Sequence, residues 1–233
     1  MLGIEGATPV ASVAVAGEGK ILAERSVDNL RTHSINLMPM IRDVLADAGL
    51  GRGDLGGVAV SSGPGSFTGL RISMSTAKTL AQVWRLPIAG ISTFDVLAYP
   101  LAGHGSLLCP ILNARKNEVY AALYDASGGE PALLAGPLAV GLEELARLLG
   151  RHEGRVSFLG DGAPVFREEL ADRLGERVQF LPRCASFPRG AAVAELGWRF
   201  INTGRGADPL ALLPQYVRQS EAEVKWQEKH GAG

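Results

Sequence analysis

A glycine-rich loop is the part of this sequence whose residue types and spacing most directly suggest chemistry. It reads GPGSFTGLR over residues 63–71 and follows an apolar run at 58–60. Gly63 and Gly65 can adopt backbone angles that other residues resist, and Ser66 can cap the helix that follows. This arrangement predicts a strand, a tight turn and a helix start, whose outward amide groups can bind an anion or a partner's acceptor groups.

The loop does not match the common nucleotide motifs. A P-loop needs Lys followed by Ser or Thr directly after its last glycine, whereas Leu70 and Arg71 follow Gly69. The spacing from Gly65 to Gly69 is one residue too long for the dinucleotide fingerprint. The residues alone therefore leave two interpretations open, a structural turn and a phosphate or partner site.

Further blocks occur in a fixed order along the chain. They are Leu2 to Glu5, Arg31 to His33, Asn113 to Arg115, Glu118 to Tyr120 and Pro214 to Arg218. Together with the loop at 63–71, they resemble the TsaB family, also called YeaZ, over residues 2–218. That family is the non-catalytic subunit of the bacterial machinery that places threonylcarbamoyl on adenosine 37 of tRNAs.

Composition limits the class of protein. The 23 basic and 24 acidic residues nearly cancel, so the overall charge does not favour a protein that grips nucleic acid by itself. Two cysteines, Cys109 and Cys184, are too few for a disulfide framework. No apolar run reaches the roughly 18 residues needed to cross a membrane. We expect a cytoplasmic protein without a leader peptide.

The apolar periodicity changes in the same order twice along the chain. The first half predicts strands at 2–5, 10–16, 21–26, 57–61 and 87–91. It predicts helices at 33–48, from the glycine loop, with Ser66 or Thr68 as its cap, to about residue 84, and from a cap at Ser92 or Thr93 to just before Pro100. The second half predicts strands at 107–112, 118–124, 133–140, 156–159 and 178–181, and helices at 142–149, 164–174 and 188–203. Two such copies predict a duplicated α/β fold in which helices cover two mixed sheets. The resemblance implies the actin-like (ASKHA, ribonuclease H-like) fold.

The predicted organisation has two lobes and a tail. The N-terminal actin-like lobe covers residues 1–104, and the C-terminal lobe covers 105–219. A hinge is expected at 102–105, where two glycines lie close together. Residues 220–233 are rich in charge and predict a frayed helix or a mobile tail.

Two polar residues stand where the resemblance implies a vestigial nucleotide or phosphate site. ATP-using relatives orient Mg²⁺ and phosphates with a carboxylate after the first strand and another at the start of the second lobe. Here these positions hold Glu5 and Asn113, whereas the family usually has Asp at both. Asn113 carries no charge to hold a cation. The alternative is that Glu5 caps a turn and Asn113 satisfies backbone groups.

No metal site or hydrolytic site is predicted. The catalytic relative binds its metal through two His four residues apart on one helix, whereas the four His of this chain are isolated. His33 is expected at the surface or as a helix cap. No Ser, His and acid grouping in a recognisable context supports a peptidase.

Two helices of the first lobe show wide apolar arcs. The arc of the helix at 33–48 spans about 160°, more than the roughly 100° that covering one sheet requires. Pattern alone fits either two buried core helices or a surface left for another protein, and the resemblance favours the latter. The expected interface residues are Leu37, Met38, Ile41, Leu45, Arg71, Met74, Ser75 and Lys78.

The resemblance implies a scaffolding and activating subunit with no intrinsic cofactor and no catalysis of its own. Its expected partners are a TsaD-like catalytic subunit, a TsaE-like ATPase, and tRNA through the complex, with ATP or ADP and Mg²⁺ at the partner interface. The free chain is expected to form a homodimer. The alternative is a stand-alone ATP-dependent small-molecule kinase or acyltransferase.

Overall fold

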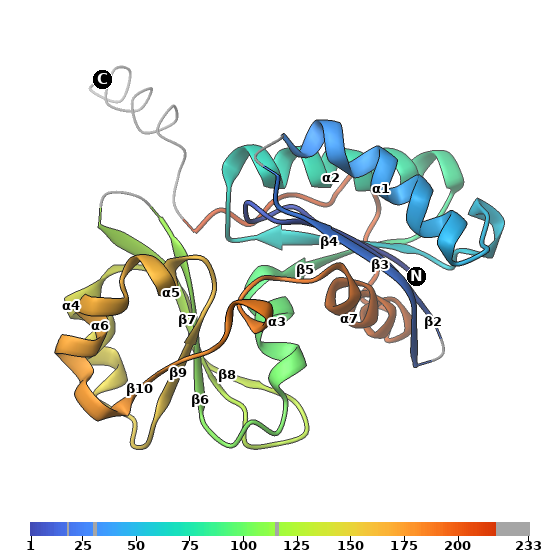
Figure 1. Cartoon of the computed structure of the whole chain (residues 1–233). Coiled ribbons are helices and arrows are strands. Elements are labelled where there is room, and N and C mark those ends of the chain that lie inside the picture. The colour runs from blue at the N-terminus through green and yellow to red at the C-terminus, as the bar shows by residue number, and fades with distance from the viewer. Residues whose placement is uncertain (18, 30–31, 115–116, 218–233) are drawn as a thin grey trace, which may run out of the picture.

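The computed structural model describes residues 1–17, 19–29, 32–114 and 117–217. Within these ranges the chain forms two five-stranded sheets, each covered by helices (Figure 1). No helix of these ranges is long and apolar enough to span a membrane. Arg31, Arg115 and Arg218, and the predicted tail at 220–233, lie outside the described residues.

The first sheet has the strand order β3-β2-β1-β4-β5. β1 pairs antiparallel with β2 and parallel with β4, so the sheet is mixed as predicted. Its strands are β1 (Leu2–Glu5), β2 (Ala11–Gly17), β3 (Lys20–Val27), β4 (Val58–Gly63) and β5 (Ile88–Ser92). The helices and 3₁₀ turns of this part are α1 (His33–Asp47), η1 (Arg52–Asp54), α2 (Phe67–Trp84), α3 (Thr93–Ala98) and η2 (Tyr99–Leu101).

The second sheet repeats this topology in the order β10-β9-β6-β7-β8. Its strands are β6 (Leu107–Asn113), β7 (Glu118–Asp125), β8 (Ala132–Gly141), β9 (Val156–Leu159) and β10 (Val178–Phe180). The remaining elements are α4 (Leu142–Leu149), α5 (Gly162–Val165), α6 (Arg167–Leu174), η3 (Gly175–Arg177), η4 (Arg183–Ala185) and α7 (Gly190–Asn202). The predicted element order is confirmed, except that the helix expected at 164–174 is two helices.

The main core of the first lobe lies between its sheet and the helix pair α1 and α2. Alternate strand residues point into this core, including Ile4 of β1 and Val60 of β4. Burying a side chain of this size contributes about 1.5–3 kcal/mol. α1 contacts both the sheet and α2, so the two helices lie side by side on one face.

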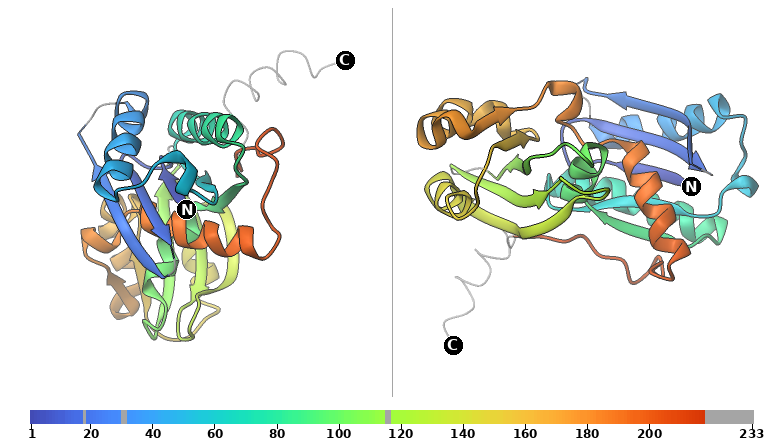
Figure 2. Two further views of the ribbon diagram at one scale, coloured as in Figure 1. Left: turned by 90° about the vertical axis from the view of Figure 1, so that its right-hand side faces the viewer. Right: turned by 90° about the horizontal axis from the view of Figure 1, so that it is seen from below.

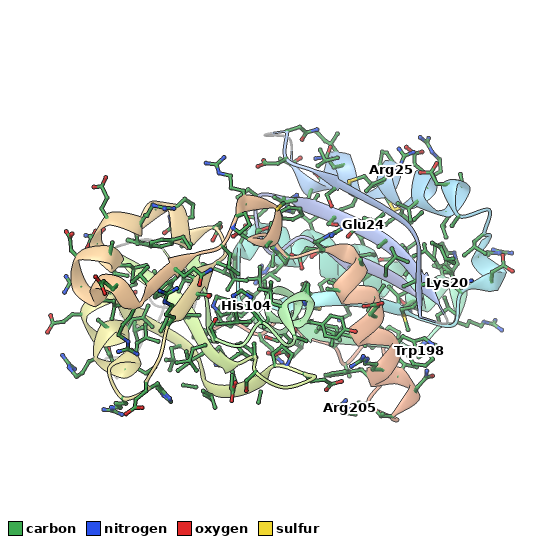
Figure 3. All side chains as sticks on the ribbon, turned by 60° about the horizontal axis from the view of Figure 1, so that its bottom comes forward. Lys20, Glu24, Arg25, His104, Trp198 and Arg205 are labelled. Atoms are coloured by element: carbon green, nitrogen blue, oxygen red, sulfur yellow. The ribbon has the colours of Figure 1, made fainter. Side chains whose placement is uncertain are left out.

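The last helix, α7, covers the opposite face of the first sheet (Figure 2). Glycines make this close approach possible. A Cβ on Gly3 would meet the carbonyl oxygen of Gly190, and a Cβ on Gly197 would meet the side chain of Ala59. Trp198 lies on the outer side of α7 and is half exposed (Figure 3). The range 105–219, expected to form the second lobe, therefore contributes a helix to the first.

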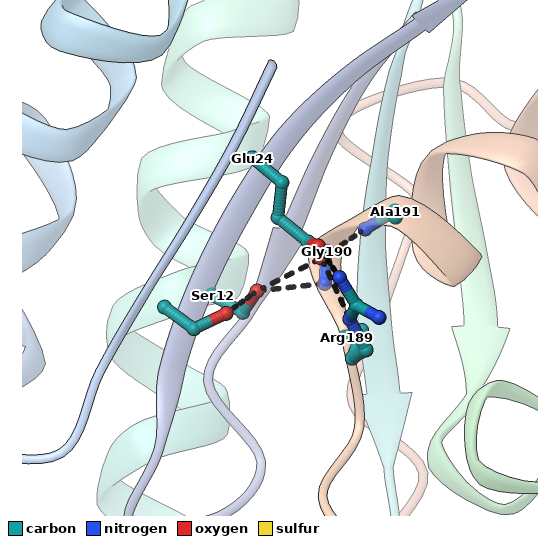
Figure 4. A network of polar contacts seen from close by, with 6 residues as sticks. Ser12, Glu24, Arg189, Gly190 and Ala191 are labelled. Carbon is teal, nitrogen blue, oxygen red and sulfur yellow. Dashed lines mark hydrogen bonds and ion pairs between the residues drawn. The ribbon is translucent and has the colours of Figure 1, made fainter. Parts of the chain in front are cut away.

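Polar side chains of β2 and β3 hold the first turn of α7 (Figure 4). Ser12 Oγ accepts a hydrogen bond from the Gly190 N–H at 2.9 Å. Glu24 Oε1 accepts one from the Ala191 N–H at 3.0 Å, and the same carboxylate pairs with Arg189. Because the N-terminus of a helix carries a partial positive charge, a carboxylate there is favourable.

Helix α3 joins the lobes through a shared apolar cluster. Phe94 and Leu97 of α3 are buried in one cluster with Leu108 and Leu159 of the second sheet. The predicted hinge at 102–105 follows α3 and η2 along the chain, and its mobility stays a prediction.

Residues 207–217, which we call the C-terminal strap, run from β5 toward the glycine loop (Figure 1). The Ala207 N–H donates to the carbonyl oxygen of Ile88 at 2.7 Å, and the Gln215 N–H donates to that of Ser62 at 2.6 Å. Between these two bonds, Leu212 packs so closely on Gly90 that a Cβ there would meet its side chain.

We predict that Gly3→Ala will destabilise the protein strongly, because the added methyl group meets the backbone of α7 at Gly190 and Ala194. Overpacking of this kind costs about 1–3 kcal/mol or more. Urea unfolding measures the loss. Gly17→Ala is the matched control, because a Cβ there meets nothing within 4 Å. Equal stability of the two variants would contradict the packing described for α7.

Candidate functional site

The glycine loop at 63–66 links β4 to α2 and is packed against two other segments. Gly63 has a φ of +119°, and a Cβ there would meet the carbonyl oxygen of Gln215 in the strap. The Ser66 N–H donates to Ala7 O at 2.7 Å, and Ser66 Oγ caps α2 by accepting from the Gly69 N–H at 3.2 Å. Because these two amide groups donate to the protein itself, the contacts support the structural interpretation of the loop.

Glu5 lies fully buried at the end of β1. Its Oε1 accepts from the Ala7 N–H at 2.6 Å, and its Oε2 accepts from the Ser61 hydroxyl. Burial raises the pKa of Glu5 from 4.5 to about 7, although these hydrogen bonds oppose the shift. This geometry supports the turn-capping alternative, because the carboxylate presents no exposed oxygen to a hydrated cation.

Glu5 is part of a polar row that crosses four adjacent strands. Ser26 of β3 is paired with Ser12 of β2, and Ser12 with Glu5 of β1, while the Ser61 hydroxyl of β4 donates to the Glu5 carboxylate. The hydroxyl oxygens of Ser12 and Ser26 are 2.8 Å apart. Since Ser12 also binds the first turn of α7, the row connects the centre of the sheet to that helix. Sequence reasoning missed the row, although Glu5, Ser12 and Ser61 stand out as polar residues in the apolar strands β1, β2 and β4.

The resemblance implies a carboxylate at position 113 in the second lobe. The structure has Asn113 there, and the neighbouring carboxylate is that of Asp161. The Asn113 N–H donates to Asp161 Oδ1 at 3.1 Å, and burial raises the pKa of Asp161. Asp161 stands between Gly160, with a φ of +94°, and Gly162, in the loop that corresponds to the glycine loop of the first repeat. An acid flanked by glycines after a predicted strand was the signal that sequence reasoning overlooked.

The residues predicted at the partner interface divide into buried and exposed groups. Leu37, Ile41 and Met74 are almost fully buried in the core, and Leu45 packs against its edge. The prediction that these side chains lie on an exposed surface is therefore corrected. The apolar arc of α1 is wide because α1 packs against both the sheet and α2.

The exposed group gives the helix pair an outer surface. Met38, Arg71 and Ser75 are exposed, and Lys78 is half-buried. The structure adds Ile35 and Val83, which are 56% and 67% exposed and which are not among the predicted interface residues. Exposed apolar side chains are common when they occur singly, so Ile35 and Met38, which lie three residues apart on α1, are the neighbouring pair that marks a candidate contact surface.

A groove of about 580 Å³ lies between α2 and the strap. Its lining residues are Arg71, Met74, Ser75, Lys78, Thr79 and Gln82 of α2, and Pro209, Leu210, Leu212, Leu213, Pro214 and Tyr216 of the strap. The groove thus brings together four residues predicted at the interface, namely Arg71, Met74, Ser75 and Lys78, and seats them against the strap. We refer to it as the α2–strap groove.

Two histidines have structural contacts. His33 is buried, contrary to the expected surface position, and its Nε2 lies 2.9 Å from Thr8 O. His104 Nε2 lies 3.2 Å from Ser157 Oγ (Figure 3). Across the described ranges, no three or more His, Cys, Asp and Glu side chains form a group that could hold a metal ion.

Comparisons with known proteins give a family model and a relative that covers nearly the whole chain. The family model described as TsaD, tRNA N6-adenosine threonylcarbamoyltransferase, matches residues 21–226. The tRNA threonylcarbamoyladenosine biosynthesis protein TsaB of Bacillus subtilis is 31% identical over 226 residues, which cover 97% of each chain.

Solved structures are also similar to this chain. YeaZ from Pseudomonas aeruginosa has a TM-score of 0.77 and 25% identity, covering 92% of this chain and 98% of that one. The activator of 2-hydroxyisocaproyl-CoA dehydratase from Clostridium difficile, solved with bound ADPNP, has a TM-score of 0.53 at 11% identity, covering 88% and 96%. This distant likeness concerns the fold alone, and with the two repeated sheets it confirms the predicted actin-like class.

We predict that Glu5→Gln will change the pH dependence of stability. Between pH 4.5 and 7 the folded state keeps a proton on Glu5 that the unfolded chain releases, so the free energy of unfolding falls as the pH rises through this window. The loss is at most about 3 kcal/mol above pH 7. Glutamine carries no charge, so the variant should be more stable than wild type at pH 8 and similar to it at pH 4.5.

Urea unfolding at the two pH values measures this difference. Glu143→Gln removes an exposed carboxylate and serves as the control, with little change expected at either pH. A Glu5→Gln variant that is destabilised equally at both pH values would contradict the raised pKa of Glu5.

Proposed function

Because this chain belongs to the TsaB (YeaZ) family, we propose that it is a non-catalytic subunit of the machinery that makes N6-threonylcarbamoyladenosine at position 37 of tRNA. In this role it docks and activates a TsaD-like catalytic subunit through the outer surface of α1 and α2. The catalytic subunit transfers threonylcarbamoyl from its AMP adduct to the tRNA. Membership of the family rests on the relative that matches along nearly the whole chain.

The exposed apolar side chains of the helix pair carry this proposal. Ile35 and Met38 of α1 are 56% and 51% exposed, and Phe67 and Val83 of α2 are also exposed. Other residues of both helices fill the core, and Ile35, Met38 and Val83 lie outside it, whereas Phe67 contacts Tyr216 and Arg71. Burying them against a partner releases apolar surface from water and favours association.

The state of Glu5 supports a subunit without its own catalysis. A carboxylate that positions Mg²⁺ must present an oxygen to the metal, whereas both oxygens of Glu5 accept hydrogen bonds inside the sheet. The stand-alone kinase or acyltransferase would need this carboxylate to become exposed.

The proposal also covers how the complex is assembled. The free chain forms a homodimer through the same helix surface, since an exposed apolar face favours self-association by a two-fold axis. Nucleotide and Mg²⁺ bind at the interface with the catalytic subunit, and a TsaE-like ATPase acts on the complex. The tRNA is held by the complex and not by this chain alone.

We predict that Met38→Asp will leave the chain folded and weaken its binding to the purified catalytic subunit by at least about tenfold, because the charge must be desolvated in an apolar contact. Calorimetry measures binding, and modification of tRNA supplied with threonylcarbamoyl-AMP measures activity. Val165→Asp is the matched control, because Val165 is similarly exposed but belongs to the second lobe. Normal binding by Met38→Asp would contradict the proposal that α1 lies at the interface.

We also predict that the purified chain will not hydrolyse ATP appreciably, because the buried Glu5 leaves no carboxylate for Mg²⁺ at the first strand. Phosphate release measures turnover. Saturable turnover by the isolated chain that Glu5→Ala abolishes would favour the kinase or acyltransferase instead.

A further inference from the structure

The α2–strap groove has the chemistry of a binding site for an acidic, amphipathic peptide segment. We infer that it receives a segment of the catalytic partner that carries carboxylate side chains about 10 Å apart. This inference rests on the proposed function, because it takes that subunit as the occupant. It adds a second contact beside the exposed apolar surface of the helices, with the strap as one of its walls.

The groove is held open by contacts at both ends of the strap. The hydrogen bonds from Ala207 to Ile88 and from Gln215 to Ser62 fix the strap along the first sheet, and Leu212 anchors its middle against Gly90. At the far end, the rings of Tyr216 and Phe67 lie 5.2 Å apart. A preformed groove of this kind binds a partner without the entropic cost of ordering its own walls.

Two cationic side chains line the groove, and both donate hydrogen bonds to neutral groups. Arg71 Nε donates to the Tyr216 hydroxyl at 3.0 Å, and its guanidinium lies 4.0 Å from the centre of the Phe67 ring. Lys78 Nζ donates to the carbonyl oxygens of Leu210 and Leu212 at 3.3 and 2.8 Å.

Among the residues that the structure describes, no carboxylate balances these charges within the groove. Its lining contains no Asp or Glu, and among the described residues neither Arg71 nor Lys78 forms an ion pair. Asp208 of the strap lies outside the lining and accepts from the Leu210 N–H. The groove therefore carries two positive charges in a chain whose formal net charge is −1. Charge complementarity favours an acidic occupant.

The spacing of the two cationic residues and the exposed leucines beside the groove indicate further properties of the occupant. Arg71 and Lys78 are seven residues apart on α2, which corresponds to about 10 Å along two helical turns. Carboxylates two turns apart on a helix, or about three residues apart on an extended chain, match this distance. Leu210 and Leu213 are about 70% exposed beside the groove, so the same segment should also present apolar side chains. An apolar rim disfavours a phosphate backbone.

The experiment uses the full chain and the purified catalytic subunit, with affinity measured at 50 and 500 mM NaCl. Arg71→Gln with Lys78→Gln removes both charges while retaining groups that can donate to the strap. The control is Arg151→Gln with Arg173→Gln, which makes the same change in net charge at two exposed positions of the second lobe. Arg71→Gln alone leaves the Lys78 bonds to the strap intact, and melting curves verify that each variant is folded.

We expect the double groove variant to bind about tenfold more weakly than wild type at 50 mM NaCl and to lose most of the salt dependence, with Arg71→Gln intermediate and the control unchanged. Affinity within twofold of wild type, or an equal loss in the control, overturns the acidic occupant while leaving docking through α1 and α2 in place. Failure of wild type to bind the subunit overturns both proposals.

Two further readouts identify a different occupant. If light scattering shows that the groove variant loses self-association while its affinity for the subunit is unchanged, a second copy of the chain occupies the groove. If the variant instead loses binding to tRNA alone, the ligand is nucleic acid. Either result overturns the inference.

Discussion

The buried carboxylate of Glu5 imposes a constraint on which much of the first lobe depends. A carboxylate removed from water must accept hydrogen bonds from protein groups, and here the donors are the Ala7 N–H and the Ser61 hydroxyl. Ala7 in turn accepts from the Ser66 N–H, which positions the start of α2. On the other side of Glu5, Ser12 binds the first turn of α7. One buried carboxyl group thus fixes the turn after β1, while its neighbours position helices on both faces of the sheet.

The consequence for function is a division of the first lobe into a rigid centre and an outer contact surface. Hydrogen bonds and buried side chains surround Glu5 at the end of β1, whereas the outer sides of α1, α2 and the strap carry exposed apolar and basic groups. These two properties support each other, because a surface that docks a partner benefits from helices that do not move. In our proposal, the site of chemistry belongs to the partner.

The sequence predicts the local structure of this chain well because each element has a clear hydrophobic period bounded by turn residues. Leu142–Leu149 and Val156–Leu159 form the helix and strand predicted at those positions. Sequence reasoning failed where the outcome depends on which distant element lies opposite. Periodicity predicts the buried face of α7, but it cannot show that the face packs on the first sheet. Periodicity likewise cannot show whether the apolar arc of α1 packs on a partner, on the sheet or on α2, which is why the pattern places Ile41 at a partner surface.

The place of α7 also matters while the protein is being made. This helix begins at residue 190 and covers the face of the first sheet that includes Ala59 and Ile91. At about 5–20 residues per second, a ribosome needs about 10–40 s to go from β1 to α7. During that interval the nascent first lobe exposes one apolar face of its sheet. The two lobes therefore cannot mature independently in order of synthesis, and the nascent chain presents a surface on which chaperones could act until its last helix is complete.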